Sequence, residues 1–312
     1  MNKRITGLLV ALCVSGQLMA QDEADALRYS RTVSGGTART QAIGGAMGSL
    51  GGDYSAAHMN PAGLGFFRTN EFVITPGFYF RNNEYTYRGF KGDDSKSGAA
   101  LPNAGLVFGM PTNNPNSKWK NVTLSLGFNR TANFNNRRYV DGDNFDHSLT
   151  EKYLEDLINS GTTSISAATN NFPLGASLAF NTFLIDTIAG AGGQIDGFRS
   201  NVFPSYGLRQ IDEIEEKGGT DEFAIGFAGN YSDKLYVGVS LNVPSIHYER
   251  NRTYTEGDIS NDSPDNDPGF YYWTLTDRVK TDAVGFNAKL GLIYSPNGAF
   301  RLGAAFHLPG TT

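Results

Sequence analysis

Several segments of this chain alternate strictly between apolar residues and small or polar ones, and this pattern constrains the fold more than any other feature. Neighbouring side chains of a β-strand point to opposite faces, so such a segment predicts a strand with one apolar face and one polar or crowded face. Five segments show the pattern clearly, and two more show it in part. The clear ones are residues 122–128, 223–228, 235–243, 286–294 and 300–307, and the partial ones are residues 71–81 and 101–110.

The connections between these segments separate a soluble β-sandwich from a membrane barrel, because alternation alone fits both. Long connections are expected at residues 82–100, 135–220 and 251–269, and short ones at residues 111–121, 231–234 and 295–299. Long and short connections alternate along the chain, as they do in up-and-down outer-membrane barrels. The sequence therefore predicts an all-β fold in which residues 71–312 form a transmembrane up-and-down antiparallel β-barrel.

Composition agrees with this prediction. The 312 residues include 38 glycines, and 18% are charged, whereas soluble domains average roughly 25% charged residues and about 7% glycine. Beyond the N-terminal leader no window approaches the roughly 20 apolar residues of a transmembrane helix. A closed barrel is the other structure that satisfies every backbone group in lipid. The net charge of −5 argues against a nucleic-acid partner.

The N-terminus has the order of a secretory signal peptide. Lys3 and Arg4 precede a short apolar run, and Ala20 stands where cleavage is expected. The signal peptide is therefore expected at residues 1–20. A lipoprotein signal at Cys13 is the alternative, but Cys13 lies inside the apolar run. It is the only cysteine, so the mature chain must be held by packing and hydrogen bonds without disulfides.

The strand count suggests a longer barrel. The seven expected strands are an odd number, whereas bacterial single-chain barrels normally have an even one. An open sheet would also leave two bare edges in lipid. The chain ends at residues 308–312, where the seventh strand would enter an outside loop. We expect the 312 residues of this chain to be the N-terminal part of a longer protein.

Residues 135–220 are expected to form an extracellular helical insertion. Ser148 and Glu151 fit a capping box, followed by a helical face that ends at Gly161. Amphipathic helices need a surface to pack on. They either cover the barrel mouth only, or their apolar faces form a landing groove for a hydrophobic ligand. Two further helices are expected at residues 173–186 and 209–217.

Residues 21–70 lack strand alternation and are rich in small residues. A glycine- and alanine-rich stretch ending at Asp53 precedes the sequence Asn60-Pro61-Ala62-Gly63. Proline presets φ, and an asparagine side chain can bond nearby backbone, so Asn60-Pro61 predicts a fixed turn. Glycines allow a backbone to approach a wall closely. An ordinary glycine-rich loop is the alternative. A phosphate-binding loop does not fit, because Gly44 and Gly45 lack the lysine and the strand–turn–helix context.

In this order, residues 39–67 resemble the N-terminal hatch of the outer-membrane transporters of long-chain fatty acids and aromatic hydrocarbons, the FadL/TodX type, and specifically a Bacteroidetes-like member. The resemblance implies a barrel plugged by residues 21–70. Ligand would enter from outside, reach an apolar pocket, and leave sideways through a gap in the wall when the hatch shifts. The implied hatch and gating residues are Asn60, Pro61, Ala62, Gly63, Gly44 and Gly45.

The family marks its lateral gap by a kink in the third strand. Here that strand, residues 122–134, contains no proline. Pro76 and Pro244 are the visible residues that would interrupt a strand ladder. The position of the exit and the ligand-binding residues are therefore left unassigned.

The implied function is passive transport of hydrophobic small molecules across the bacterial outer membrane, without enzymatic activity, cofactor or metal. The expected partners are the ligand, membrane lipid and lipopolysaccharide, around a monomeric barrel. Two alternatives stay open: a structural or shuttle component of type IX secretion, and a haem receptor using His58. The histidines show no metal-ligand spacing, and no Gly-x-Ser-x-Gly motif occurs. Four aspartates between Asp258 and Asp267 fit a solvated loop better than a calcium loop.

Overall fold

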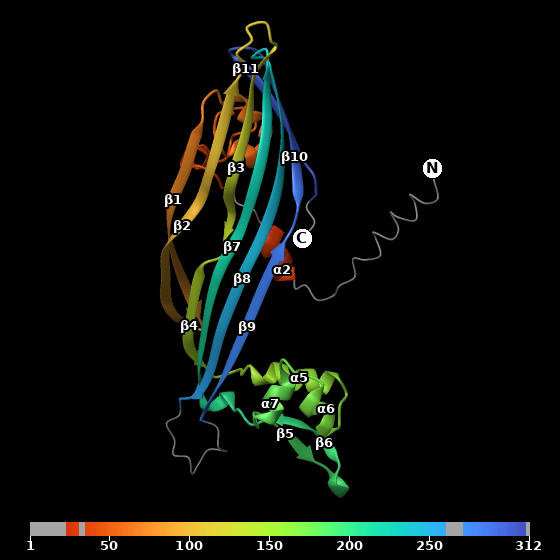
Figure 1. Cartoon of the computed structure of the whole chain (residues 1–312). Helices are drawn as coiled ribbons and strands as arrows, with labels where there is room; N and C mark the ends of the chain where they lie inside the picture. The colour runs from red at the N-terminus through yellow and green to blue at the C-terminus, as the bar shows by residue number, and fades with distance from the viewer. Residues whose placement is uncertain (1–22, 31–34, 260–270, 310–312) are drawn as a thin grey trace, which may run out of the picture.

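The computed structural model describes residues 23–30, 35–259 and 271–309. The expected signal peptide and most of the acidic stretch, residues 260–270, lie outside the described residues. Most of the described chain is one antiparallel sheet that curls into a half-barrel (Figure 1). Its strands are β1 (Glu71–Tyr87), β2 (Phe90–Pro111), β3 (Trp119–Asn133), β4 (Asn136–Asn144), β7 (Leu208–Tyr231), β8 (Leu235–Asp258), β9 (Tyr272–Val284), β10 (Asn287–Asn297) and β11 (Phe300–His307).

The strands pair in the order β1-β2-β3-β7-β8-β10-β11. Strand β4 continues the position of β3, because both pair with β7. Strands β9 and β10 likewise share one position against β8. The sheet therefore has seven strand positions, and each contains one of the predicted strands. The predicted all-β, up-and-down antiparallel fold is confirmed.

The strands are longer than the alternation predicts, and three expectations are wrong for this reason. Residues 82–100 are not a loop, since β1 and β2 run on to a tight turn at Arg88 and Gly89, both with positive φ. Residues 209–217 are not a helix but part of β7. Residues 251–258 belong to β8, not to a loop. Charged residues hide the strand pattern here, and cross-strand partners satisfy them, as Asp212 does with Arg252 at 2.7 Å.

The helical insertion follows β4 and lies at the end of the sheet opposite the turns that join β2 to β3, β7 to β8 and β10 to β11 (Figure 1). It contains α5 (Thr150–Asn159), α6 (Ile165–Asn170), α7 (Ala176–Asn181), β5 (Ile185–Ala189), β6 (Ile195–Ser200) and the single turns η2 (Ala191–Gly193) and η3 (Pro204–Tyr206). Tyr153, Leu157, Ile185 and Phe198 are among its core residues, and Trp273 of β9 packs against them.

Two expectations about the insertion need correction. The helix after residue 148 is confirmed, but the capping box is wrong, because Leu149 occupies the cap position without a side-chain cap bond. Ser148 accepts a hydrogen bond from the Thr150 amide at 3.1 Å and donates to Glu256 on β8 at 2.6 Å. The helix expected at residues 173–186 is shorter, because the chain turns into β5 at Ile185.

The N-terminal part consists of short helices on the concave face of the sheet: α2 (Glu23–Ser30), α3 (Ala38–Ala42), α4 (Ala56–Met59) and η1 (Pro61–Phe66). We call residues 35–70 the hatch segment, the sheet face that it covers the hatch face, and the opposite one the outer face. Within the described ranges, no helix has both the length and the apolar character needed to cross a membrane.

The sheet divides along its length into two halves. The hatch half carries the hatch segment and contains the first part of β1, the last part of β2, β3, the last part of β7, the first part of β8, β10 and β11. The extension half contains the remainder of β1, β2, β7 and β8 together with β4 and β9, and it ends at the helical insertion (Figure 1). In the hatch half, outward apolar side chains are exposed at alternate positions, as Phe72, Ile74, Phe78 and Phe80 are on β1.

Candidate functional site

The Asn60-Pro61-Ala62-Gly63 turn sits at the centre of the contact between the hatch segment and the sheet. The Asn60 side chain accepts from the Ala62 amide at 3.1 Å and donates to the Gly48 carbonyl at 2.6 Å. It also donates to the Leu292 carbonyl of β10 at 3.3 Å. Pro61 starts η1, and the Gly63 amide bonds the Asn60 carbonyl at 2.9 Å. The Asn60 side chain therefore joins the turn, the glycine-rich stretch and the sheet. We call the part of the sheet that contacts the hatch segment the wall.

The sheet meets this turn with glycines. A Cβ on Gly238 of β8 would overlap the Pro61 carbonyl, and one on Gly291 of β10 would overlap the Asn60 side chain. Within the hatch segment, a Cβ on Gly63 would lie 2.8 Å from the Ala56 Cβ. These separations are shorter than van der Waals contact allows, so each of these close approaches exists only because one of its two partners is a glycine.

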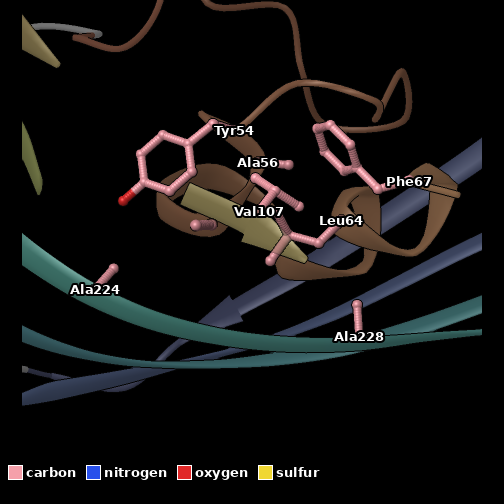
Figure 2. Close-up of a cluster of buried hydrophobic side chains, with 8 residues drawn as sticks. Tyr54, Ala56, Leu64, Phe67, Val107, Ala224 and Ala228 are labelled. Atoms are coloured by element: carbon pink, nitrogen blue, oxygen red, sulfur yellow. The ribbon is translucent and has the colours of Figure 1, made fainter. Parts of the chain in front are cut away.

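An apolar cluster beside the turn completes the contact (Figure 2). Tyr54, Leu64 and Phe67 of the hatch segment form one cluster with Ala224 and Ala228 of β7, and Leu64 points to this strand. Wall asparagine Asn121 fixes the end of the segment, because its amide donates to the carbonyls of Gly65 at 3.0 Å and Phe67 at 2.7 Å. The contact is thus apolar at its centre and hydrogen-bonded at its margin.

Gly44 and Gly45 take a different place from the other predicted gating residues. They follow α3 with φ of 64° and 81° and reverse the chain, and a Cβ on Gly44 would meet nothing within 4 Å. Asp53 organises this part of the segment: it is buried and accepts hydrogen bonds from Thr37 at 2.7 Å and the Ser55 amide at 2.8 Å. The structure therefore brings residues 60–63 to the wall and leaves Gly44 away from it.

A buried charged cluster links α4 to the wall. Lys289 of β10 bonds Glu222 of β7 and donates to the His58 carbonyl at 3.0 Å. His58 Nδ1 lies 3.1 Å from Glu222 Oε1. Burial lowers the pKa of His58, and the hydrogen bond to Glu222 opposes that shift only in part. His58, the residue of the haem-receptor alternative, therefore lies inside the hatch–wall contact.

A cavity of about 540 Å³ lies beside this cluster, between the hatch segment and the wall. His58, Glu222 and Lys289 line it together with Asn129 of β3 and His307 of β11. In the described part of the chain, no group of three or more histidine, cysteine or acidic side chains is placed to hold a metal ion.

On one side of the hatch segment the sheet has a seam, a line along which neighbouring strands are not joined by backbone hydrogen bonds. The ladder between β2 and β3 ends at Asn103 and Asn129, and β4 pairs with β7 alone. Beyond that point side chains bridge the gap, including Arg81 to the Asn133 carbonyl at 2.7 Å and Lys96 to Glu215 at 2.9 Å. The seam starts in a region whose outer face is still apolar. The exposed side chains of Phe78 and Phe80 on β1 lie there, because these residues pair with the part of β2 that precedes Asn103 and has no ladder to β3.

Strand three also breaks within the seam, four residues after Asn129, although it contains no proline. Strand β3 stops at Asn133, and the Phe134 amide then bonds the Gly218 carbonyl at 3.0 Å before β4 begins. On the concave side, α2 covers this break. Tyr29 packs edge-on against Phe134 and Tyr248, with ring centroids 6.2 and 6.1 Å away. Arg28 lies 4.2 Å from the centroid of the Tyr248 ring.

The wall residues of this site were not predicted from the sequence. Gly238 and Gly291 were visible as small partners in the alternation, but nothing in the sequence distinguishes a glycine that faces a hatch from one that faces water. Glu222 and Lys289 offered a better signal. Each is a charged residue at the start of an otherwise apolar and small strand segment, where an inward charge usually marks a partner or a function.

Comparisons with known proteins add little. No family model and no curated protein matches the chain. Among solved structures, it is similar to a chain described as a CymD monoaromatic hydrocarbon channel. The TM-score is 0.21 and the sequence identity 10%, over 88% of this chain and 94% of the other. A similarity of this size supports no conclusion about this protein.

Proposed function

We propose that this chain forms part of an outer-membrane channel that passively transports hydrophobic small molecules, long-chain fatty acids or aromatic compounds, and is gated by the hatch segment. The observation that carries the proposal is the asymmetry of the hatch half. Its outer face exposes alternating apolar side chains, whereas its other face is covered by a small-residue plug. Exposing this outer face to water would be unfavourable, because removing apolar surface from water stabilises a protein by about 25 cal/mol per Å². Contact with lipid removes that surface from water.

The seam is the proposed lateral exit. Backbone groups left without a ladder are costly in lipid unless other groups satisfy them. Here polar side chains and α2 cover the gap, and both can move without breaking a strand ladder. In this proposal Asn60, Pro61, Ala62 and Gly63 hold the hatch closed through Gly238 and Gly291. Gly44 and Gly45 supply the turn that lets the glycine-rich stretch fold back on Asn60.

A deletion strain tests the proposal. Growth would be measured with a long-chain fatty acid or with toluene as the limiting carbon source, with and without the full-length gene. We expect deletion to slow growth on at least one of them and the gene to restore it, while growth on succinate stays unchanged. Unchanged uptake of both compounds would reject the transport function. Loss of protein export with normal uptake would instead favour the secretion alternative.

A further inference from the structure

Two buried polar atoms, on residues that line the cavity beside the hatch, have no protein partner in the described part of the chain. They are Nε2 of His58 and Oδ1 of Asn129, on residues that are 7% and 3% exposed. Buried polar atoms are nearly always hydrogen-bonded, and leaving one unpaired costs about 1–3 kcal/mol. Two such atoms on residues that line one cavity, one on the hatch and one on the wall, therefore point to a ligand.

The chemistry of both atoms is fixed by their surroundings. His58 Nδ1 lies 3.1 Å from the Glu222 carboxylate, which only accepts hydrogen bonds, so Nδ1 carries the proton. Burial also keeps the ring neutral. Nε2 is then a lone-pair acceptor. Asn129 Oδ1 is a carbonyl acceptor, so the cavity presents two acceptors and needs a donor.

The charges around the cavity do not favour an anion. Lys289 is the one lysine or arginine among the lining residues, and Glu222 neutralises it through a direct ion pair. His307 is occupied by the Met59 carbonyl at 2.9 Å. A carboxylate would bring only acceptors to two acceptors and would also meet the Glu222 charge. A neutral hydroxyl can donate to either group.

We propose that this cavity binds a neutral, mostly apolar molecule with a hydrogen-bond-donating head group, a phenol or an alcohol, and that His58 and Asn129 recognise the head. The proposal rests on the transport function proposed above and narrows its ligand class, because it disfavours carboxylates at this point of the path. A site built to bond a hydroxyl discriminates against the analogue that lacks it, since its own polar groups then stay unpaired.

Phenol, toluene and benzoate test the proposal, because they share one ring and differ in the head group. Binding to the full-length protein in detergent would be measured by calorimetry at pH 7.5. We expect phenol to bind about tenfold more tightly than toluene, the worth of one net hydrogen bond, and benzoate to bind most weakly. Equal affinity for phenol and toluene, or a preference for benzoate, would overturn the inference.

Variants and spectroscopy then assign the contacts. His58→Leu should remove most of the preference for phenol over toluene. Because His58 also joins the hatch to Glu222, Asn129→Ala serves as a second variant that leaves this cluster intact, and it should reduce the preference as well. The ¹⁵N resonance of His58 Nε2 should shift with phenol and not with toluene. An unmoved resonance together with an unchanged preference in Asn129→Ala would rule out this head-group site.

The two proposals fail separately. Uptake of toluene and phenol by the deletion strain, compared with and without the full-length gene, reports on transport alone. If the gene speeds uptake of both compounds and phenol shows no preference in binding, the channel stands and the head-group site is wrong. If the gene speeds uptake of neither, the transport function is wrong.

Discussion

The hatch half and the extension half of the sheet share strands, pairing and register, yet they present opposite surfaces. On β8, Leu241 and Val243 project outward in the hatch half, while Glu249 and Thr253 do so in the extension half. In the described strands of the extension half, exposed large apolar side chains occur only at strand ends, at Phe90, Tyr272 and Val284. The boundary of the apolar surface therefore lies within continuous strands, and the sheet continues past it.

The two halves are also held together differently. The hatch half packs a small-residue segment against glycines and alanines of the wall. The extension half relies on ladders and cross-strand ion pairs, such as Arg250 with Asp277 at 2.7 Å. The Arg130–Asp221 pair, at 2.8 Å, stands near the boundary on the outer face. Strand geometry alone thus does not mark a lipid-facing segment, and the composition of the outward positions does.

The largest expected effect comes from placing the same charge on each half of one strand. Leu241→Arg should destabilise the folded barrel by about 2–4 kcal/mol, the cost of an outward arginine near the bilayer midplane. Thr253→Arg, on the same face of β8, should leave stability unchanged. Urea titration of the full-length protein in lipid vesicles measures both. Equal effects of the two variants would break the assignment of the hatch half to lipid.

This comparison also explains what the sequence could predict. Wherever apolar residues alternated, as from Leu235 to Val243, the strand was found. Where charges filled the outward positions, as from Arg209 to Lys217, the pattern looked helical. A side chain such as Glu213 has no preference for a strand until Arg137 lies beside it, and that partner is distant in sequence. The same limit applies to the site: Asn60 could be singled out, but Gly238, Glu222 and Lys289 needed the pairing of strands.

Overpacking the hatch contact should have the next largest effect. Gly238→Ala places a Cβ on the Pro61 carbonyl, and overpacking typically costs about 1–3 kcal/mol. The closed hatch should therefore lose about ten- to a hundredfold in population. We expect a rise in single-channel conductance or in sensitivity to bulky antibiotics. Gly257→Ala, on the extension half of β8, meets only ordinary contacts at 3.5 Å and serves as the control. Unchanged conductance and unchanged antibiotic sensitivity in Gly238→Ala would mean that this contact does not keep the channel closed.

A smaller and local effect is expected at the far end of the extension half. Buried Glu256 accepts hydrogen bonds from the Leu149 amide at 2.8 Å, Gln210 at 2.7 Å and Trp273 at 3.1 Å, and so joins the helical insertion to the sheet. Glu256→Gln turns one acceptor into a donor, at a cost of about 1–3 kcal/mol. Proteolysis within residues 145–207 should speed up while the barrel core stays resistant. Glu249→Gln, at a half-buried position of the same strand outside this hydrogen-bond network, should not change it.

The smallest effect is expected for the exposed ion pairs that give the extension half its charged surface. Arg137 and Glu213 lie 2.9 Å apart on neighbouring strands, with both side chains more than 40% exposed. Water competes for both groups, so a double-mutant cycle of Arg137→Gln and Glu213→Gln should give a coupling of about 0.2–1 kcal/mol that shrinks as salt is added. A coupling several times larger and insensitive to salt would mean that this pair is shielded from water. The extension half would then not face water at this pair, and its contrast with the lipid-facing hatch half would be wrong.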